Sequence, residues 1–526
     1  MDTKALRQKI LDLAIRGKLV PQDPNDEPAS VLLERIREQK QQMVKEGKLK
    51  KKDIKNDSVI FVGEDNLHYE KFADGSVKCI EDEIPFELPE RWVWARLNQI
   101  YNFIDYRGAT PNKISAGVPL ITAKNVKSGY IDYSVDEYIS EEEYWERQQR
   151  GTSRLGDILF TTEAPLGNAA IANIDKFSAG QRLITFQHYG NCTLNNTTFL
   201  YFILSDIFQN QLHTRKTGST VAGIKASILK TLVLPVPPLK EQEKIYNACG
   251  NLLTLTGKIA SDKQDILSII SKTKSKILDL AIRGQLVPQN LDDEPASVLL
   301  ERIRAEKEEL IKQGKLKRDK KEFVIFKGED NSYYEKLPDG KVNCIDEQLP
   351  FELPDGWEWC NLSMIGTTNI GLTYRPVDID TQGIIVLRSC NIVNDEINLT
   401  DLVHVKTSIR ENQFVQKDDI LICARNGSRS LVGKCALVPE FDEKVSFGAF
   451  MAVYRTPYFN YIVHFLRSNF FRSVFDDSNS TAINQLTQDM LKRAVVPLPP
   501  LEEQLRIVDK TTELYERLNC IEESLS

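Results

Sequence analysis

Ile277-Leu-Asp-Leu-Ala-Ile-Arg-Gly284 repeats Ile10-Leu-Asp-Leu-Ala-Ile-Arg-Gly17 without a change, and this repetition decides the architecture of the chain. The segment from Glu294 to Arg304, Glu-Pro-Ala-Ser-Val-Leu-Leu-Glu-Arg-Ile-Arg, likewise repeats the segment from Glu27 to Arg37. Both matches have an offset of 267 residues (277 against 10, 294 against 27). The chain therefore contains a long internal duplication.

A second matched pair indicates where the duplication is cut. Pro235-Val-Pro-Pro-Leu-Lys-Glu-Gln242 corresponds to Pro497-Leu-Pro-Pro-Leu-Glu-Glu-Gln504 at an offset of 262 residues (497 against 235). Extending the matches aligns Ser526 with Gln264 and Met1 with Ser268, so only three residues of the repeat are unrepresented at the junction. Because one terminus supplies what the other lacks, we expect two similar halves related by a pseudo-two-fold axis, with adjacent termini. Such a chain suits a target that is itself bipartite.

Length and composition indicate a two-domain protein of ordinary polarity. A chain of 526 residues is too long for one core. No apolar run approaches the roughly 20 residues that span a bilayer, and the start of the chain lacks an apolar signal core. The nine cysteines include no Cys-x-x-Cys pair, and the five histidines do not cluster. We expect reduced, structural cysteines, no metal site and a cytoplasmic protein.

The charge balance excludes a protein that holds nucleic acid by bulk charge alone. Sixty-eight basic and 75 acidic side chains give a net charge of −7. Basic residues nevertheless form local runs at Lys50-Lys-Lys52 and Lys317-Arg318. A nucleic-acid surface on this chain must therefore be local, or shared with a partner.

Apolar spacing predicts helices in the duplicated segments. Ala29, Leu32 and Ile36 follow a helical period, with Asn25 or Asp26 as the expected N-cap, Pro28 in the first turn and Gly47 as the stop; Ala296, Leu299 and Ile303 repeat the pattern up to Gly314. The stretch from Lys240 to Arg283 contains no proline and carries a narrow apolar seam, which predicts one helix about 60 Å long at about 1.5 Å per residue. The counterpart of this helix is divided between 501–526 and 1–16. The permuted junction favours antiparallel pairing within the chain over an intermolecular coiled coil.

Between these helices the sequence predicts hairpins and two globular domains. Asp74-Gly75 and Asp339-Gly340 separate short β-rich runs, as in hairpin turns. Short strands such as Ile158-Leu-Phe160 and Ile420-Leu-Ile422, and helical pieces at 197–213 and 458–475, indicate an α/β domain in each half. The predicted fold class is therefore α/β (α+β): two similar globular domains joined by long antiparallel coiled-coil helices in a circularly permuted pseudo-two-fold repeat.

No catalytic motif is visible in the sequence. Gly218-Ser-Thr-Val-Ala-Gly-Ile-Lys225 lacks the Gly-Lys-Ser/Thr ending of a phosphate-binding loop. The chain contains no Asp/Asn-Pro-Pro-Tyr/Phe motif for adenine methylation and no Gly-x-Gly-x-x-Gly loop after a strand. Glu440-Phe-Asp-Glu-Lys444 lacks the spacing of a nuclease metal site and is typical of a solvated loop.

Polar, turn-rich segments with basic residues occur in both globular stretches. Examples are Arg107-Gly-Ala-Thr-Pro-Asn-Lys113 in the first and Arg425-Asn-Gly-Ser-Arg429 in the second. Arginine can contact guanine through two hydrogen bonds, Asn or Gln can do so with adenine, and a carboxylate can accept from cytosine. Hydroxyls and lysines suit phosphates. Each segment taken alone reads equally well as a solvated turn, but their recurrence in both halves favours DNA recognition.

The chain resembles the specificity subunits of type I restriction-modification systems over nearly its whole length. The resemblance is carried by the two Pro-x-Pro-Pro-Leu-x-Glu-Gln segments and by Pro85-Phe-Glu-Leu-Pro89 with Pro350-Phe-Glu-Leu-Pro354. It is carried further by Ala164-Pro-Leu-Gly-Asn168, and by Arg425-Asn-Gly-Ser428 followed by Phe447-Gly-Ala-Phe-Met451. It implies two target-recognition domains that each read one half of a split site, and helices that set the spacer and dock partner subunits.

The resemblance also implies what the partners supply. The chain is expected to be non-catalytic and to act with double-stranded DNA, two modification (methyltransferase) subunits and restriction (motor/nuclease) subunits, without a membrane. S-adenosylmethionine, ATP and Mg are expected in those partners, and no cofactor in this chain. The expected divisions are helices at 1–50, a hairpin segment at 51–89, recognition domain 1 at 90–238, central helices at 239–322, a hairpin segment at 323–354, recognition domain 2 at 355–500 and a final helix at 501–526.

The residues expected to contact DNA carry the side chains described above and lie in the polar segments of the two domains. In the first domain they are Arg107, Thr110, Lys113, Lys124, Asn125, Thr162, Glu163, Ser219, Thr220 and Lys225; in the second they are Arg375, Arg388, Asn391, Arg425, Asn426, Ser428, Arg429, Lys434, Ser480 and Asn484. Two alternative hypotheses remain: a self-sufficient methyltransferase, which the missing adenine motif disfavours, and a protein-only coiled-coil adaptor, which leaves the Arg- and Asn-rich loops unexplained.

Overall fold

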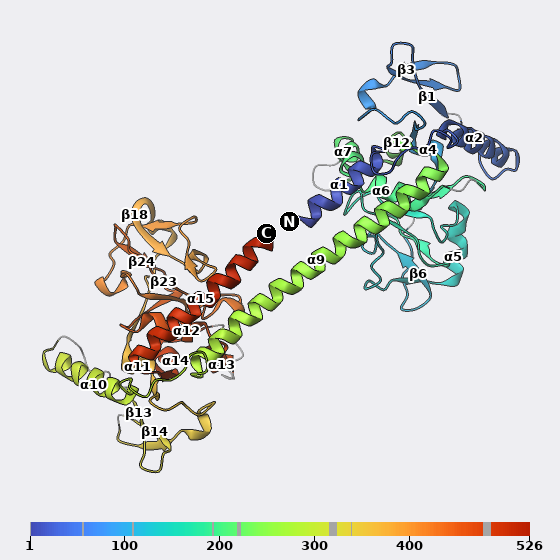
Figure 1. The fold of residues 1–526 in the computed structure, drawn as a ribbon. Helices are drawn as coiled ribbons and strands as arrows, with labels where there is room; N and C mark the ends of the chain where they lie inside the picture. Colours follow the sequence, from blue (N-terminus) through green and yellow to red (C-terminus); the bar gives the residue numbers. More distant parts are fainter. Residues whose placement is uncertain are drawn as a thin grey trace. The chain divides into compact units, whose positions relative to one another are not determined.

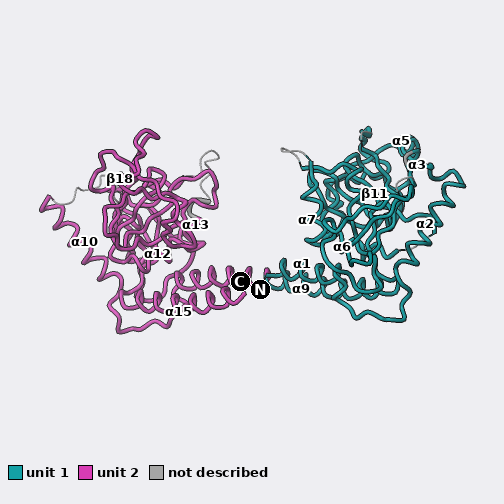
Figure 2. Tube along the Cα trace, turned by 90° about the horizontal axis from the view of Figure 1, so that it is seen from above, with its two compact units in different colours: residues 1–263 teal, residues 264–526 magenta. Residues whose placement is uncertain are grey.

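The computed structural model divides into two units, Met1–Lys263 and Gln264–Ser526, each described by itself (Figure 2). The structure describes residues 2–54, 57–107, 110–191, 194–217, 222–314, 323–337, 339–476 and 485–525. The boundary between the units lies inside one helix, so each unit contains one half of it. The duplication read from the sequence therefore coincides with a duplication of structure.

The helices of unit 1 are α1 (Thr3–Ile15), α2 (Ala29–Lys45), α3 (Lys51–Ile54), α4 (Leu97–Ile100), α5 (Glu141–Arg147), α6 (Asn196–Ile203), α7 (Asp206–Thr214), α8 (Ala226–Leu229) and the first half of α9 (Leu239–Ile282). Those of unit 2 are the second half of α9, α10 (Ala296–Lys312), α11 (Leu362–Ile365), α12 (Phe459–Arg467), α13 (Asn469–Asp476), α14 (Gln488–Arg493) and α15 (Leu501–Leu525).

The strands of unit 1 are β1 (Ser58–Val62), β2 (His68–Phe72), β3 (Val77–Cys79), β4 (Val93–Arg96), β5 (Tyr101–Asp105), β6 (Val118–Ile121), β7 (Tyr138–Ile139), β8 (Ile158–Thr161), β9 (Ala169–Ile171), β10 (Ser178–Ala179), β11 (Leu183–His188) and β12 (Val233–Val236). Those of unit 2 are β13 (Val324–Lys327), β14 (Tyr333–Lys336), β15 (Val342–Cys344), β16 (Glu358–Asn361), β17 (Thr367–Ile370), β18 (Ile379–Leu387), β19 (Ile392–Val393), β20 (Glu396–Ile397), β21 (Val403–Val405), β22 (Ile420–Cys423), β23 (Cys435–Leu437), β24 (Val445–Phe447), β25 (Met451–Arg455) and β26 (Val495–Leu498).

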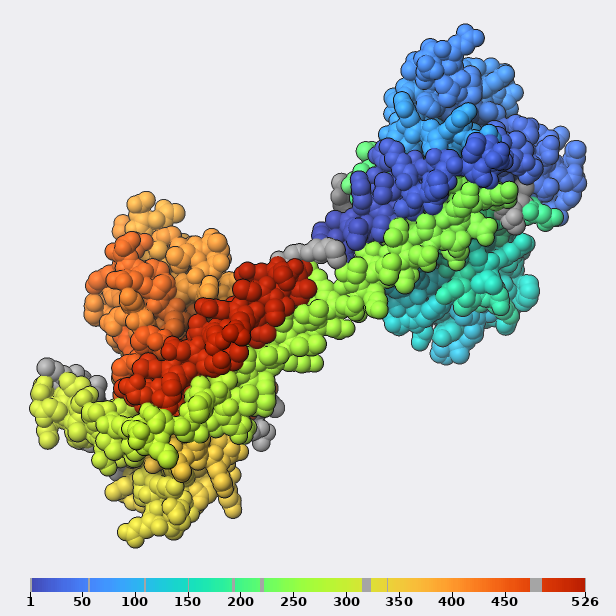
Figure 3. All heavy atoms as spheres, in the orientation of Figure 1, coloured from blue at the N-terminus to red at the C-terminus, as the bar shows by residue number. Residues whose placement is uncertain are grey.

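Each unit contains an antiparallel pair of helices, as the permuted repeat predicts (Figures 1 and 3). In unit 2, Lys274 of α9 pairs with Glu522 at 2.8 Å, whereas Glu503 at the start of α15 receives a hydrogen bond from Gln289, beyond the end of α9. In unit 1, α1 takes the place of α15, and Lys244 of α9 pairs with Asp26 at 3.2 Å. The helix α9 thus pairs within the chain, which confirms the intrachain pairing, and Ile245, Ile270 and Ile277 of its apolar seam are buried while Ile259 and Ile266 are 37% and 38% exposed.

The recognition domain of each unit is built around a four-stranded antiparallel sheet. Its strand order is β5-β11-β8-β9 in unit 1 and β17-β25-β22-β23 in unit 2. Along β8, Ile158 and Phe160 pack into the core shared with α1 and α6, while Leu159 packs into a second core on the opposite face. Because both faces are buried, this strand is apolar at consecutive positions.

A smaller mixed sheet supplies the second core. Its order is β10-β6-β7 in unit 1 and β21-β18-β24 in unit 2, and the β6–β10 and β18–β24 pairs are parallel. In unit 2, Leu421 and Phe447 lie together in the core between the two sheets. Two divergent sequences therefore build the same layers, helices on one face of the main sheet and the mixed sheet on the other.

The predicted hairpin segments form three-stranded antiparallel sheets, β1-β2-β3 and β13-β14-β15. Gly75, at φ +86°, lies in the turn that joins β2 to β3. In unit 1 this sheet is joined to the recognition domain by Arg96, which pairs with Glu70 and Glu83 at 2.6 Å each. Burial alone would raise the pKa of Glu83, but hydrogen bonds and charge from Arg96, Lys78 and Arg215 lower it to about 2.

Three local predictions need correction. The N-cap of α2 is Pro28, not Asn25 or Asp26; the carboxylate of Asp26 is buried and faces Lys244 instead. The helical piece expected at 197–213 is two helices, because Ser205 has an extended backbone and its hydroxyl caps α7. Ser468 interrupts the piece at 458–475 in the same way and accepts from the backbone N–H of Phe471 at 3.2 Å.

Candidate nucleic-acid interface

Loops from distant parts of unit 1 meet at one end of its four-stranded sheet and its smaller mixed sheet. Strands β5, β8 and β10 end there and β11 begins there, since Asp105 faces Ile184 and Thr161 faces Leu183 across the sheet. We call residues 106–107, 110–113, 162–168, 180–182 and 222–225 the loop edge of unit 1. Three groups of residues expected from sequence to contact DNA, those around Arg107, Glu163 and Lys225, thus share one surface.

Hydrogen bonds fix the arrangement of this edge. Arg107 forms an ion pair with Asp105 at 2.7 Å and donates to the carbonyl of Ile224 at 3.2 Å. The hydroxyl of Thr110 donates to the side chain of Gln181 at 3.0 Å. Burial would raise the pKa of Asp105, but its hydrogen bonds with Arg107 hold that pKa below its ordinary range. Asp105 therefore stays ionised and orients the guanidinium of Arg107 at the edge.

Glu163 and Arg182 form an exposed ion pair at the loop edge of unit 1. Their charged atoms lie 3.1 Å apart. The backbone N–H of Thr162 donates to the carbonyl of Arg182, and the backbone of Glu163 bridges to Gly223. Thr162 itself is buried, and its hydroxyl also donates to the carbonyl of Arg182. Thr162 therefore holds the loop, and the ion pair faces solvent.

The corresponding loops gather in unit 2. We call residues 371–375, 388–391, 424–431, 448–450 and 485–487 the loop edge of unit 2. The amide of Asn426 donates to the hydroxyl of Ser389 at 3.2 Å, which joins two of these loops. The Asn426 carbonyl also accepts from the backbone N–H of Ser428, and the hydroxyls of Ser428 and Ser430 are hydrogen bonded. Arg429 begins a short 3-10 turn in the same loop.

Arg425 lies over the ring of Phe450 at this edge. The guanidinium carbon is 5.4 Å from the ring centroid, a cation–π distance. Phe450 is 60% exposed. A cavity of about 260 Å³ adjoins the pair and is lined by both side chains together with Ile370, Gln485 and Gln488. This edge offers a cation and an apolar ring to a ligand.

Asn125 and Asn391 occupy equivalent positions and are buried inside their domains. The side-chain oxygen of Asn125 accepts from the backbone and hydroxyl of Thr122, and its amide donates to the carbonyls of Asp132 and Val135. The amide of Asn391 donates to two carbonyls in the same way. Reading a base would break these hydrogen bonds, so we assign both residues a loop-holding role and remove them from the proposed base-contacting set.

The other predicted residues are spread around the two edges. Lys113 and Lys124 both approach Glu137, at 2.8 and 3.9 Å, and Lys225 is exposed at the start of α8. Exposed Arg375 pairs with Asp378 at 3.2 Å, and Arg388 pairs with Asp401 at 3.0 Å. Ser219, Thr220, Ser480 and Asn484 lie outside the described residues. The DNA contacts of all these residues stay predictions.

Sequence reasoning missed Gln181, Arg182 and Phe450. They lie in the turn after β10 and at the equivalent turn after β24, which no polar motif marks. Their common signal is a Gly at the end of a short parallel strand, Gly180 and Gly448. That signal becomes visible only when the strand order of the mixed sheet in unit 1 is compared with that in unit 2.

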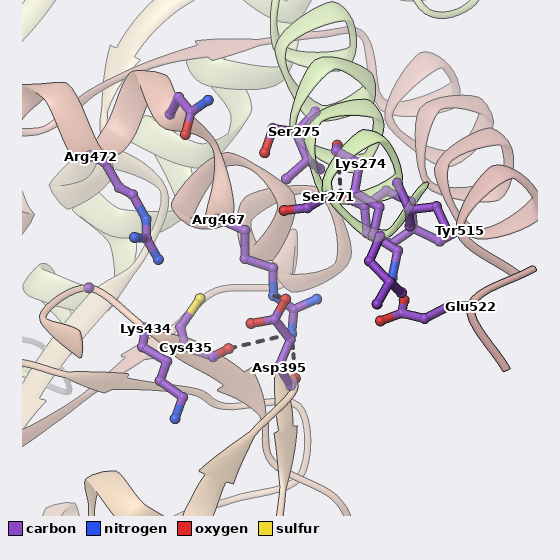
Figure 4. Close-up of a pocket in the computed structure, with 15 residues that line it drawn as sticks. Ser271, Lys274, Ser275, Asp395, Lys434, Cys435, Arg467, Arg472, Tyr515 and Glu522 are labelled. Carbon is purple, nitrogen blue, oxygen red and sulfur yellow. Dashed lines mark hydrogen bonds and ion pairs between the residues drawn. The ribbon is translucent and has the colours of Figure 1, made fainter. Parts of the chain in front are cut away.

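Lys434 lies in a separate polar cleft of about 420 Å³ in unit 2 (Figure 4). Arg467 donates to the backbone carbonyl of Asp395 at 2.6 Å, and Lys274 pairs with Glu522 across the helices. The hydroxyl of Tyr515 donates to the carbonyl of Lys274, and burial raises the pKa of this phenol. The last two contacts join α15 to α9, and the first lies inside the domain of unit 2.

The described part of the chain holds no cluster of three or more His, Cys, Asp or Glu side chains suited to a metal ion. Across the same residues, no helix combines the length and apolarity needed to cross a bilayer.

These features define a class: paired α/β domains that present loop edges, each fastened to an antiparallel helix pair. The chain belongs to the family described as type I restriction modification DNA specificity domain, whose model matches residues 89–266 and 354–525. It is 29% identical to the type I restriction enzyme EcoAI specificity subunit of Escherichia coli, over 98% of this chain and 89% of that one.

Two further comparisons agree with the family. The EcoEI specificity subunit of Escherichia coli is 27% identical over 97% of this chain and 89% of its own length. A solved chain from a study of complex assembly and conformational transition of the type I R-M system has a TM-score of 0.51 at 16% identity. It covers 84% of this chain and is itself covered to 94%, which supports the fold alone.

Proposed function

We propose that this chain is the non-catalytic specificity subunit of a type I restriction-modification complex, and that each loop edge reads one half of a bipartite DNA site. The observation that carries the proposal is that the two units share their sheets and helix pair but differ in the side chains at their loop edges. The same sheets and helix pair recur in both units, while equivalent edge positions carry Glu163 with Arg182 in one and Arg425 with Phe450 in the other. Different side chains on the same frame would read different half-sites.

The helix pairs are proposed to dock the partner subunits. Two modification subunits would supply S-adenosylmethionine-dependent methylation, and restriction subunits would supply ATP- and Mg-dependent cleavage. The net charge of −7 supports this division of labour, because a chain with more acidic than basic groups binds DNA best when partners complete the positive surface. The complex would act on double-stranded DNA in the cytoplasm.

The test is methylation of a DNA library by the chain together with the modification subunits of its own host. The expected result is one methylated motif made of two specified parts separated by an unspecified spacer, with no methylation by the chain alone. Methylation by the purified chain alone would identify a self-sufficient methyltransferase. Assembly with the partners but no sequence preference would identify a protein-only adaptor.

A further inference from the structure

Backbone hydrogen bonds show which residues of the two loop edges are equivalent next to β8 and β22. In unit 1 the N–H of Thr162 donates to the carbonyl of Arg182 at 3.0 Å; in unit 2 the N–H of Ala424 donates to the carbonyl of Phe450 at 2.9 Å. The next residues, Glu163 and Arg425, bridge to Gly223 and Gln485 respectively. Glu163 is therefore equivalent to Arg425.

The same hydrogen bonds make Arg182 equivalent to Phe450. This residue pair therefore contains one arginine in each unit, supplied by opposite members of the pair. In unit 1 it follows β10, and the carboxylate of Glu163 holds it. In unit 2 it follows β22, and the ring of Phe450 holds it. Both pairs are accessible, since the side chain of Arg182 is 52% exposed and Phe450 is 60% exposed.

The chemistry of a restrained arginine suits one base. A guanidinium presents parallel N–H donors that match the O6 and N7 acceptors of guanine in the major groove. A partner that fixes the guanidinium plane before binding reduces the conformational entropy lost on binding. Glutamate does this through charge and hydrogen bonding, and phenylalanine through stacking.

We propose that Arg182 and Arg425 are specificity-determining residues, each contacting a guanine in its own half-site, and that Glu163 and Phe450 are positioning residues. This inference rests on the proposed function. The arginine comes from the turn after β10 in unit 1 and from the loop after β22 in unit 2. The two half-sites would therefore present their guanines at different points along the two loop edges.

The experiment uses the full chain assembled with its modification subunits and a library randomised in each half-site. Arg182→Ala is expected to reduce the preference for guanine at one position of one half-site by about 10- to 100-fold, and Arg425→Ala to do the same in the other half-site only. Arg→Lys at either position should retain binding but lose most of the guanine preference, because an ammonium is a point donor. Glu163→Gln should weaken the preference at the same position that Arg182 reads.

Matched controls come from the opposite ends of β10 and β24, the strands that precede Arg182 and Phe450. Lys176 pairs with Glu141 just before β10, and Lys444 pairs with Glu411 just before β24. Lys176→Ala and Lys444→Ala should leave both half-site preferences unchanged.

Preferences unchanged in both arginine variants, or lost equally in both half-sites, would overturn the inference. So would a Glu163→Gln change at a base pair other than the one that Arg182 reads. Each variant should still methylate DNA that has another base in place of the guanine, and this rate of methylation confirms that the variant is folded. A wild-type complex without a two-part motif would instead reject the proposed function itself.

Discussion

The indole N–H of Trp92 donates a 3.0 Å hydrogen bond to the carboxylate of Glu241, which fastens the recognition domain of unit 1 to the first turn of α9. Gln22, after α1, donates to the other carboxylate oxygen at 3.1 Å. Unit 2 repeats the arrangement, with Trp357 donating to Glu503 at 3.0 Å. Burial raises the pKa of Glu241, and the hydrogen bonds from Gln22 and Trp92 partly oppose this. One buried carboxylate thus joins three segments in each unit.

Removing the indole donor should destabilise the corresponding unit. Trp92→Phe is expected to lower the free energy of unfolding by about 1–3 kcal/mol, because it leaves a buried carboxylate oxygen without its partner. Trp357→Phe should have a similar effect. Trp145, which is 64% exposed, provides the matched control, and Trp145→Phe should change stability little. Denaturant unfolding measures all three, and equal effects at Trp92 and Trp145 would contradict the assignment.

The turn after α1 should accept no side chain at Gly17. This residue has φ +65°, and an added Cβ would lie 2.5 Å from Cγ of Pro89. Gly17→Ala should therefore combine backbone strain with a steric clash and cost about 2–4 kcal/mol of unfolding free energy. Gly47→Ala, at φ +74° with nothing near the added Cβ, should cost only the strain of about 1 kcal/mol. Thermal unfolding compares the two, and a smaller loss at Gly17 would refute the argument.

Asp157 should make the stability of unit 1 depend on pH. Burial raises its pKa from 3.8 to about 6, partly opposed by hydrogen bonds from the Arg154 backbone and the Gln187 amide. Because the folded-state pKa is the higher one, the contribution to stability is fully present below about pH 3.8 and is lost as pH rises through about 6. Asp157→Asn should therefore raise the unfolding free energy at pH 8 and change it little at pH 4.

Unit 2 supplies the control for this pH effect. Asp419 stands where Asp157 stands, but Arg455 pairs with it at 2.8 Å in the place of Gln187. Asp419→Asn should lower stability at pH 8, because it removes the charge that Arg455 neutralises. Unfolding curves between pH 4 and 8 test both variants, and effects of the same sign at pH 8 would count against this account.

Asn125→Ala and Asn391→Ala should separate loop-holding residues from base-reading residues. Each substitution removes buried hydrogen bonds, so a loss of about 2–4 kcal/mol in unfolding free energy is expected. DNA affinity should fall by the same factor for the preferred site and for sites with one altered base. Binding assays across such a series provide the measurement. A change of preference at a single base pair would return these residues to the reading set.

The sequence by itself determined the division of this protein into two units and the positions of its long helices. The repeats at Ile10 and Ile277, and those at Pro235 and Pro497, predicted two units. The apolar spacing and the absence of proline predicted a long central helix and its divided counterpart, because both signals are local in the sequence. The family followed from the same segments. Most loop segments that form the edges were also visible as polar, turn-rich stretches.

Only the tertiary structure decided what those loops do. The partnership of Glu163 with Arg182, and of Arg425 with Phe450, joins residues on different strands, so no local pattern announces it. Asn125 and Asn391 resembled base-reading amides in sequence but are buried, with their amides hydrogen bonded inside the domain. Whether a polar side chain faces solvent or holds a loop depends on the layers packed around it, and long-range strand pairing sets those layers.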